Sequence, residues 1–178
     1  MIDAAVVGTL APYGALLLGL VVGSFLNVVI ELQGETPEPL PNRWFGLDYL
    51  ITPPSTCPKC GHGIRAWENI PIVSYLMLRA RCSNCRTPIS VRYPLVEALS
   101  GLLSLYVVLH FGPDLKALSA LVLVWGLIAL TVIDLDEQLL PDQLTLPLVW
   151  LGLVVNIDGL FPELVSAAIG AAAGYPSP

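Results

Sequence analysis

The sequence predicts an α-helical protein that crosses a membrane several times and carries one polar insert. Of its 178 residues, 55% are hydrophobic and 12% are charged, about half the charged share of an ordinary soluble domain. The apolar residues form runs long enough to cross a bilayer, and seven of the eight Lys and Arg residues lie between Arg43 and Arg92. This composition excludes disordered, coiled-coil, collagen-like and basic nucleic-acid-binding proteins, so we expect the lipid bilayer and no nucleic acid as a partner.

The first expected span occupies residues 1–30. Between Asp3 and Glu31 there is no charged side chain, and Pro12 fits the first turn of a helix that runs to Ile30. Because no basic segment precedes this run, we predict a retained span and not a cleaved signal peptide.

Three further apolar runs predict three more spans, and a fifth run is too short to cross. The last of the three could extend through Phe161, and the fifth run ends in a Pro-Ser-Pro sequence that a helix does not readily continue through. In order, these runs cover residues 94–111, 117–133, 143–157 and 164–175.

The insert, residues 31–93, sets the expected orientation. Basic residues favour the cytoplasmic side, which places the insert in the cytoplasm and residues 111–116 outside. Residues 134–142, rich in carboxylates, then return to the cytoplasmic face. The basic insert and the carboxylates are therefore expected on the same side of the membrane.

All four cysteines lie in the insert, as the pairs Cys57/Cys60 and Cys82/Cys85 with 21 residues between them. Two CxxC pairs at this separation favour a tetrahedral four-thiolate zinc site of ribbon type. Two disulfides are the alternative, which a reducing cytoplasm disfavours. His62 is interpreted as a loop histidine, because four thiolates already complete the zinc shell.

Such a closed zinc site is usually structural, and here it would hold an insert that is too small and polar to build its own core. Between the two pairs, Glu68 and Asn69 stand out as polar residues in an otherwise apolar run.

Four carboxylates follow the third predicted span within nine residues: Asp134, Asp136, Glu137 and Asp142. Asp134 directly follows the apolar run, and an ionisable group at membrane depth is a functional candidate. A solvated helix end is the plain alternative for the other three. An Asp-x-Asp magnesium site for phosphoryl transfer is a further alternative, but no Gly-rich loop or basic companion lies nearby in the sequence. An aspartyl protease would need a second carboxylate that shares a proton with Asp134.

Several motifs, which follow one another in the order typical of the family, resemble those of the type IV prepilin leader peptidases. These are membrane aspartyl proteases that often also act as N-methyltransferases. The resemblance extends over nearly all of residues 14–175. Besides the two Cys pairs, its motifs are Gly23-Ser-Phe-Leu-Asn-Val-Val-Ile30, Ala66-Trp-Glu-Asn-Ile-Pro71, Arg92-Tyr-Pro-Leu-Val-Glu97, Ile133-Asp-Leu-Asp-Glu-Gln-Leu-Leu-Pro-Asp142 and Leu146-Pro-Leu-Val-Trp-Leu-Gly152.

The resemblance implies a bacterial inner-membrane enzyme that removes the leader from prepilins and pseudopilins of type IV pilus and type II secretion systems at the cytoplasmic face. It implies that S-adenosylmethionine then serves as methyl donor to the new N-terminal residue. Asp134 aligns with the first catalytic aspartate, and the four cysteines align with the family's zinc ligands. The domains expected are a first span (1–30), a cytoplasmic zinc ribbon associated with methyl transfer (31–93) and the N-terminal part of the peptidase domain (94–178).

Three features depart from the family pattern. The second catalytic aspartate of the family lies in a Gly-x-Gly-Asp motif after a further span, and this motif is absent from the 178 residues, which predicts a C-terminally truncated peptidase. Glu31-Leu32 replaces a common Arg-Leu-Pro continuation. Ala80 stands before Cys82 where glycine is usual, a change that bears on the methyltransferase step.

Three functions follow from these observations. The chain could be a prepilin peptidase and N-methyltransferase with an incomplete peptidase half, a membrane-anchored zinc ribbon that binds pilin precursors, or a methyltransferase without protease activity. Because one aspartate cannot be both base and acid, we expect the 178-residue chain alone not to cleave prepilin.

Overall fold

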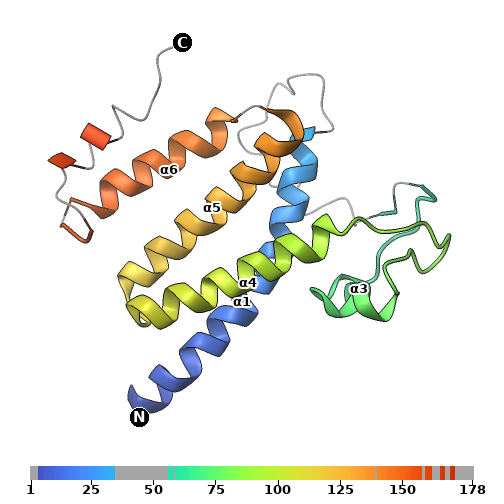
Figure 1. Cartoon of the computed structure of the whole chain (residues 1–178), viewed down its shortest axis with the longest axis horizontal. Coiled ribbons are helices and arrows are strands. Elements are labelled where there is room, and N and C mark those ends of the chain that lie inside the picture. The colour runs from blue at the N-terminus through green and yellow to red at the C-terminus, as the bar shows by residue number, and fades with distance from the viewer. Residues whose placement is uncertain are drawn as a thin grey trace.

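A computed structural model describes most of the chain and shows a bundle of helices with a small insert at one end (Figure 1). The bundle helices are α1 (Ala4–Gly34), α4 (Arg92–Phe111), α5 (Leu115–Glu137) and α6 (Asp142–Val155). The insert contains the 3-10 helix η2 (Ala66–Asn69) and the short helix α3 (Val73–Met77). The structure describes residues 4–34, 56–57, 59–138, 140–157, 159–161, 165–166 and 169–170.

Three of the described helices are long and apolar enough to cross a membrane: α1 over Gly8–Glu31, α4 and α5. Helices of spanning length are therefore present where the first three spans were predicted. Helix α6 has 14 residues and is about 21 Å long, shorter than a bilayer core of about 30 Å. The predicted fourth span is therefore a helix of less than spanning length, and the fifth predicted run lies mostly outside the described residues.

Helix α6 ends at Asn156, whose side chain takes over hydrogen bonds at the end of the helix. Its amide donates to the carbonyl of Gly152 at 2.8 Å, and its Oδ1 accepts from the N–H of Phe161 at 3.0 Å. These hydrogen bonds end α6 before the helix reaches the length of a membrane span.

Two helix boundaries differ from the prediction. Pro12 lies inside α1 and not in its first turn; neighbouring helices make an interior proline tolerable in a membrane span. Helix α5 does not end at Asp134 but continues to Glu137 and ends at Gln138, whose φ is 54°. The carboxylates in its last turn are exposed, so water can solvate their charges while the helix continues.

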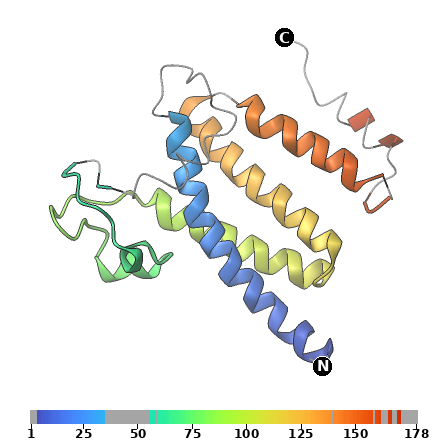
Figure 2. The same ribbon diagram turned by 180° about the vertical axis from the view of Figure 1, so that it is seen from behind.

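Helices α1 and α4 pack closely because small residues line their contact. A Cβ atom added to Gly23 would lie 2.7 Å from the Cα of Glu97 and 3.0 Å from the Cβ of Ser100. Small residues of this kind let two membrane helices approach to backbone contact. Seen from behind, α1 crosses in front of α4 (Figure 2).

Helix α5 joins this pair through one partly buried hydrogen bond and two apolar clusters. The indole N–H of Trp125 donates to the hydroxyl of Ser104 at 3.0 Å, and that hydroxyl donates to the carbonyl of Ser100 at 2.7 Å. One cluster, near the insert, contains Leu26, Ile30, Val96, Ile128, Ala129 and Ile133, and the other contains Ala15, Val107, Val108, Ala117 and Leu121.

The described part of the insert contains two isolated antiparallel bridges, Thr56 to Gly63 and Arg81 to Pro88. Each bridge closes one of the two CxxC turns. No strand is present in this part of the insert, so the predicted ribbon is represented only by its two CxxC turns; residues 35–55 lie outside the described ranges.

Candidate functional site

The four cysteines come together at the far end of the insert. Their sulfur atoms all lie within 4.8 Å of one another, with 3.8 Å between Cys57 and Cys85 and 4.0 Å between Cys60 and Cys82. Zinc–sulfur bonds of about 2.3 Å in a tetrahedron require sulfur atoms about 3.8 Å apart. All four are free cysteines, so the donor set and its spacing fit one zinc ion and not two disulfides.

The two CxxC turns have the same backbone design. In each, the first cysteine donates its N–H to the carbonyl five residues on, at 2.9 Å, and its carbonyl accepts from the N–H four residues on, at 2.8 and 3.1 Å. The residue after the second cysteine has a left-handed backbone: Gly61 has a φ of 67° and Arg86 a φ of 58°. This backbone geometry suits glycine, and only the first of the two turns has a glycine at this position.

Polar neighbours stabilise the thiolate form of the cluster. Hydrogen bonds from the Thr87 hydroxyl, 3.1 Å from the sulfur, and from the Thr87 backbone lower the pKa of the Cys85 thiol to about 6. The Asn84 amide also donates to the Cys60 sulfur, at 3.7 Å. Thiolates are the form that binds metal, so this environment favours metal uptake near neutral pH.

His62 is not one of the clustered ligand residues; its ring lies 3.9 Å from the carboxylate of Glu68. The Glu68 carboxylate accepts the backbone N–H of Arg65 at 3.0 Å, and this hydrogen bond is the main cause that lowers the Glu68 pKa. Glu68 therefore caps η2, which accounts for a polar residue within that apolar run.

Asp134 lies in the last turn of α5 and is exposed. Its neighbour Asp136 forms an ion pair with Arg92, the first residue of α4. Arg92 is 44 residues away from Asp136 in the chain, so the sequence argument, which considered only basic residues near the carboxylates in the sequence, did not find it. Since Arg92 neutralises Asp136, this pair gives no support to an Asp-x-Asp magnesium site.

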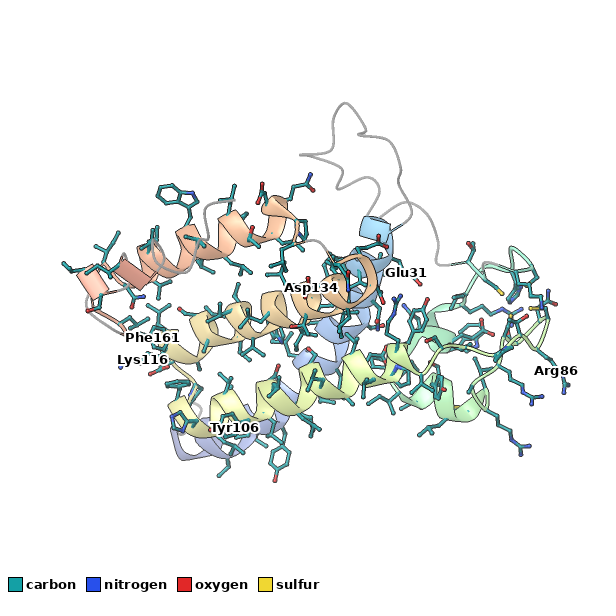
Figure 3. The ribbon with its side chains drawn as sticks, turned by 45° about the horizontal axis from the view of Figure 1, so that its top comes forward. Glu31, Arg86, Tyr106, Lys116, Asp134 and Phe161 are labelled. Atoms are coloured by element: carbon teal, nitrogen blue, oxygen red, sulfur yellow. The ribbon has the colours of Figure 1, made fainter. Side chains whose placement is uncertain are left out.

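Glu31, at the end of α1, completes the polar group around Arg92. Its carboxylate lies 4.0 Å from the Arg92 guanidinium and accepts the hydroxyl hydrogen bond of Tyr93. Figure 3 shows Glu31 and Asp134 at one end of the bundle and Lys116 at the other. Sequence reasoning treated Glu31 only as a departure from the family pattern, although a charged residue at a span end signals such a pairing.

Glu97 is a buried carboxylate within α4, to which the sequence analysis assigned no role. It is 8% exposed, and its Oε2 accepts the backbone N–H of Ile72, just before α3, at 2.7 Å. One hydrogen bond thus attaches the insert to the side of a membrane-spanning helix.

A cavity of about 360 Å3 lies between α5 and α6, among Phe111, Leu148 and Phe161. Its lining contains Ser119 and Asn156 but no charged side chain, and Phe161 is at the end of the bundle away from Asp134 (Figure 3). S-adenosylmethionine carries charged groups that this lining does not match, so the cavity is not assigned to it.

Fold and site together define a helical membrane protein in which a four-cysteine insert and a carboxylate-rich helix end lie at the same end of the bundle. Residues 17–111 match the family model of the bacterial peptidase A24 N-terminal domain, and residues 121–177 match that of the type IV leader peptidase family. The chain belongs to this family of type IV prepilin leader peptidases.

The chain is similar to proteins named prepilin leader peptidase/N-methyltransferase. It is 53% identical to the one from Stutzerimonas stutzeri over 90% of this chain and 60% of the relative. It is 50% identical to that of Pseudomonas aeruginosa (90% and 59%) and 47% identical to that of Neisseria gonorrhoeae (99% and 66%). The chain thus spans about three fifths of the length of the first two relatives. No solved structure matches it.

Proposed function

We propose that this chain forms part of a prepilin leader peptidase, with Asp134 as one of its two catalytic aspartates. The observation that carries the proposal is the exposed position of Asp134 in the last turn of α5, a helix of spanning length. The names of the relatives supply the substrate class, the prepilins.

The chemistry assigns complementary roles to two carboxylates. One activates the water that attacks the peptide carbonyl, and the other protonates the leaving amine. Asp136 is unsuited to the second role, because its ion pair with Arg92 favours the ionised carboxylate, which has no proton to donate. We propose that the second acid comes from a Gly-x-Gly-Asp segment of the family, which these 178 residues do not contain, and that they do not cleave prepilin alone.

We propose that Cys57, Cys60, Cys82 and Cys85 bind a structural zinc ion. Four thiolates leave no open coordination position, so zinc would supply rigidity to the insert and no catalytic water. The separations of the sulfur atoms support this assignment.

The proposed location is the bacterial inner membrane, with the insert and Asp134 on the cytoplasmic side. The basic insert supports this orientation. The names of the relatives also support methylation of the new N-terminal residue, with S-adenosylmethionine as the donor.

A chimaera tests the peptidase proposal. The 178 residues would be joined to the C-terminal part of the Pseudomonas aeruginosa relative and produced with a prepilin in cells that lack a prepilin peptidase. We expect leader removal, seen as a shift in prepilin mass, by the chimaera and none by the 178 residues alone.

Two matched substitutions in the chimaera assign the role of Asp134. Asp134→Asn should abolish cleavage, while Glu137→Gln, an exposed carboxylate in the same turn of α5, should leave it intact. Cleavage by the Asp134→Asn chimaera, or by the 178 residues alone, would contradict the proposal.

A further inference from the structure

The insert presents an apolar surface that the described structure leaves uncovered. Helix α3 has no buried residue; Leu76 and Met77 are 68% and 78% exposed, and Trp67 of η2 is 63% exposed. Together with Ile70 and Val73, which are 46% and 48% exposed, these residues form what we call the interfacial patch. In water, a group of this kind usually marks a binding surface.

The depth of this patch relative to the membrane follows from one hydrogen bond. Ile72, next to α3, donates its N–H to Glu97 at 2.7 Å. Glu97 lies five residues after Arg92, where spanning helix α4 begins, so it is about 7.5 Å into that helix. The start of helix α3 therefore lies at the level of the second turn of a membrane span. Figures 1 and 2 show α3 beside the N-terminal end of α4, and Figure 3 shows Arg86 at the far tip of the insert.

A strained turn keeps α3 at this depth. Ile72 has φ 61° and ψ −44°, and the N–H of Val73 donates to the carbonyl of Pro71 at 2.5 Å, which makes a γ-turn of the rare positive-φ type. A β-branched residue in this conformation is an outlier that its surroundings must hold. The hydrogen bond from the Ile72 N–H to the buried Glu97 carboxylate stabilises this conformation, and it thereby fixes the position of α3 beside α4.

Exposed basic residues accompany the patch. Arg79 and Arg81 follow α3 directly, and Arg65 lies 5.3 Å from the ring centre of Trp67. None of the ion pairs found among the described residues involves these three arginines. An apolar surface with Trp on it and arginines beside it is suited to the headgroup region of a membrane, where anionic lipids attract basic side chains.

We propose that η2 and α3 form a membrane-interface anchor. The interfacial patch enters the headgroup region of the leaflet on the insert's side, and Arg79 and Arg81 bind anionic lipid headgroups. A lipid partner is favoured over a protein because the patch lies at the depth of the second turn of a span, where lipid already surrounds the bundle. The inference rests on α4 crossing the membrane and is independent of peptidase activity.

Photo-cross-linking of the whole chain in nanodiscs of phosphatidylcholine and phosphatidylglycerol tests the proposal. Leu76→p-benzoylphenylalanine and Met77→p-benzoylphenylalanine should each form lipid adducts, identified by mass. The same replacement of Tyr106, 63% exposed in the C-terminal half of α4, is the positive control. Replacement of Asn84, exposed in the second CxxC turn, is the negative control.

We expect adduct yields at positions 76 and 77 close to that at 106 and several-fold above that at 84. Yields at the level of position 84, or cross-links to a second copy or to an added prepilin in place of lipid, would overturn the proposal. Phosphatidylglycerol should be enriched among the adducts at position 77 beyond its share in the disc. This enrichment should be lost in Arg79→Gln/Arg81→Gln, and its persistence there would overturn the role of the arginines.

Discussion

Arg86 occupies a backbone position that the other CxxC turn fills with glycine. Its φ is 58°, against 67° for Gly61, and left-handed geometry costs a non-glycine residue about 1 kcal/mol or more. We expect Arg86→Gly to tighten zinc binding by up to about fivefold, since glycine's greater freedom in the unfolded chain offsets part of the gain. Competition with a zinc chelator measures this change.

Arg81→Gly is the matched control, because Arg81 is not among the residues with positive φ. It gains no relief of strain and should leave zinc affinity unchanged or lower it. An Arg86→Gly variant that loses zinc as readily as Arg81→Gly would contradict the prediction.

Thr87 controls the acidity of Cys85, one of the proposed zinc ligands. Its hydroxyl and backbone hydrogen bonds lower the pKa of Cys85 to about 6, so Thr87→Val should raise that pKa toward the ordinary cysteine value of about 8.5. Thiolate is present above the pKa and lost as the pH falls through it, so the variant should release zinc at a higher pH than the parent chain. The pH at which zinc is released is measured by titrating the zinc-loaded protein. The pKa of Cys85 is measured from its alkylation rate against pH in metal-free protein.

Thr87→Ser keeps the hydroxyl and should keep both pH profiles. If Thr87→Val and Thr87→Ser titrate alike, the hydroxyl has no influence on the thiolate.

At the scale of elements, the close packing of α1 against α4 depends on small residues at the helix contact. Gly23→Val would force a side chain toward the Cα of Glu97, from which its Cβ alone would be only 2.7 Å away. Overpacking of this kind costs about 1–3 kcal/mol. Gly14→Val is the control, since a Cβ there has no atom within 4 Å among those described. Unfolding in detergent should show a loss of stability for the first variant, and equal stability would contradict close packing at Gly23.

Element positions were largely predictable, whereas element ends were not. Three of the four predicted spans are helices of spanning length, and they were predictable because the bilayer sets both the length and the composition of a span. The end of α5 was placed too early, since an exposed carboxylate is compatible with a further helical turn. The length of α6 was overestimated, because the Asn156 hydrogen bonds that end it are not visible as a pattern of hydropathy.

At the scale of the whole molecule, the two ends of the bundle should face different compartments. An epitope inserted after Pro113 should be cut by protease added to intact spheroplasts. One inserted after Ile64, which is exposed and outside both CxxC turns, should be cut only after lysis. The basic insert is the physical reason, because arginines and lysines favour the cytoplasmic side. The reverse pattern of cleavage would reverse the orientation and place the cysteines in an oxidising compartment.

By itself, the sequence determined three of the four predicted spans and the grouping of the four cysteines, and it singled out Asp134 as a candidate residue. Each of these depends on local spacing or on composition, which a linear chain displays directly. Only the tertiary structure decided which polar groups meet: Arg92 with Asp136 across 44 residues, Tyr93 with Glu31 across 62, and Ile72 with Glu97 across 25. Such pairs depend on how far each helix is rotated and where helices cross, and packing of small residues such as Gly23 sets both.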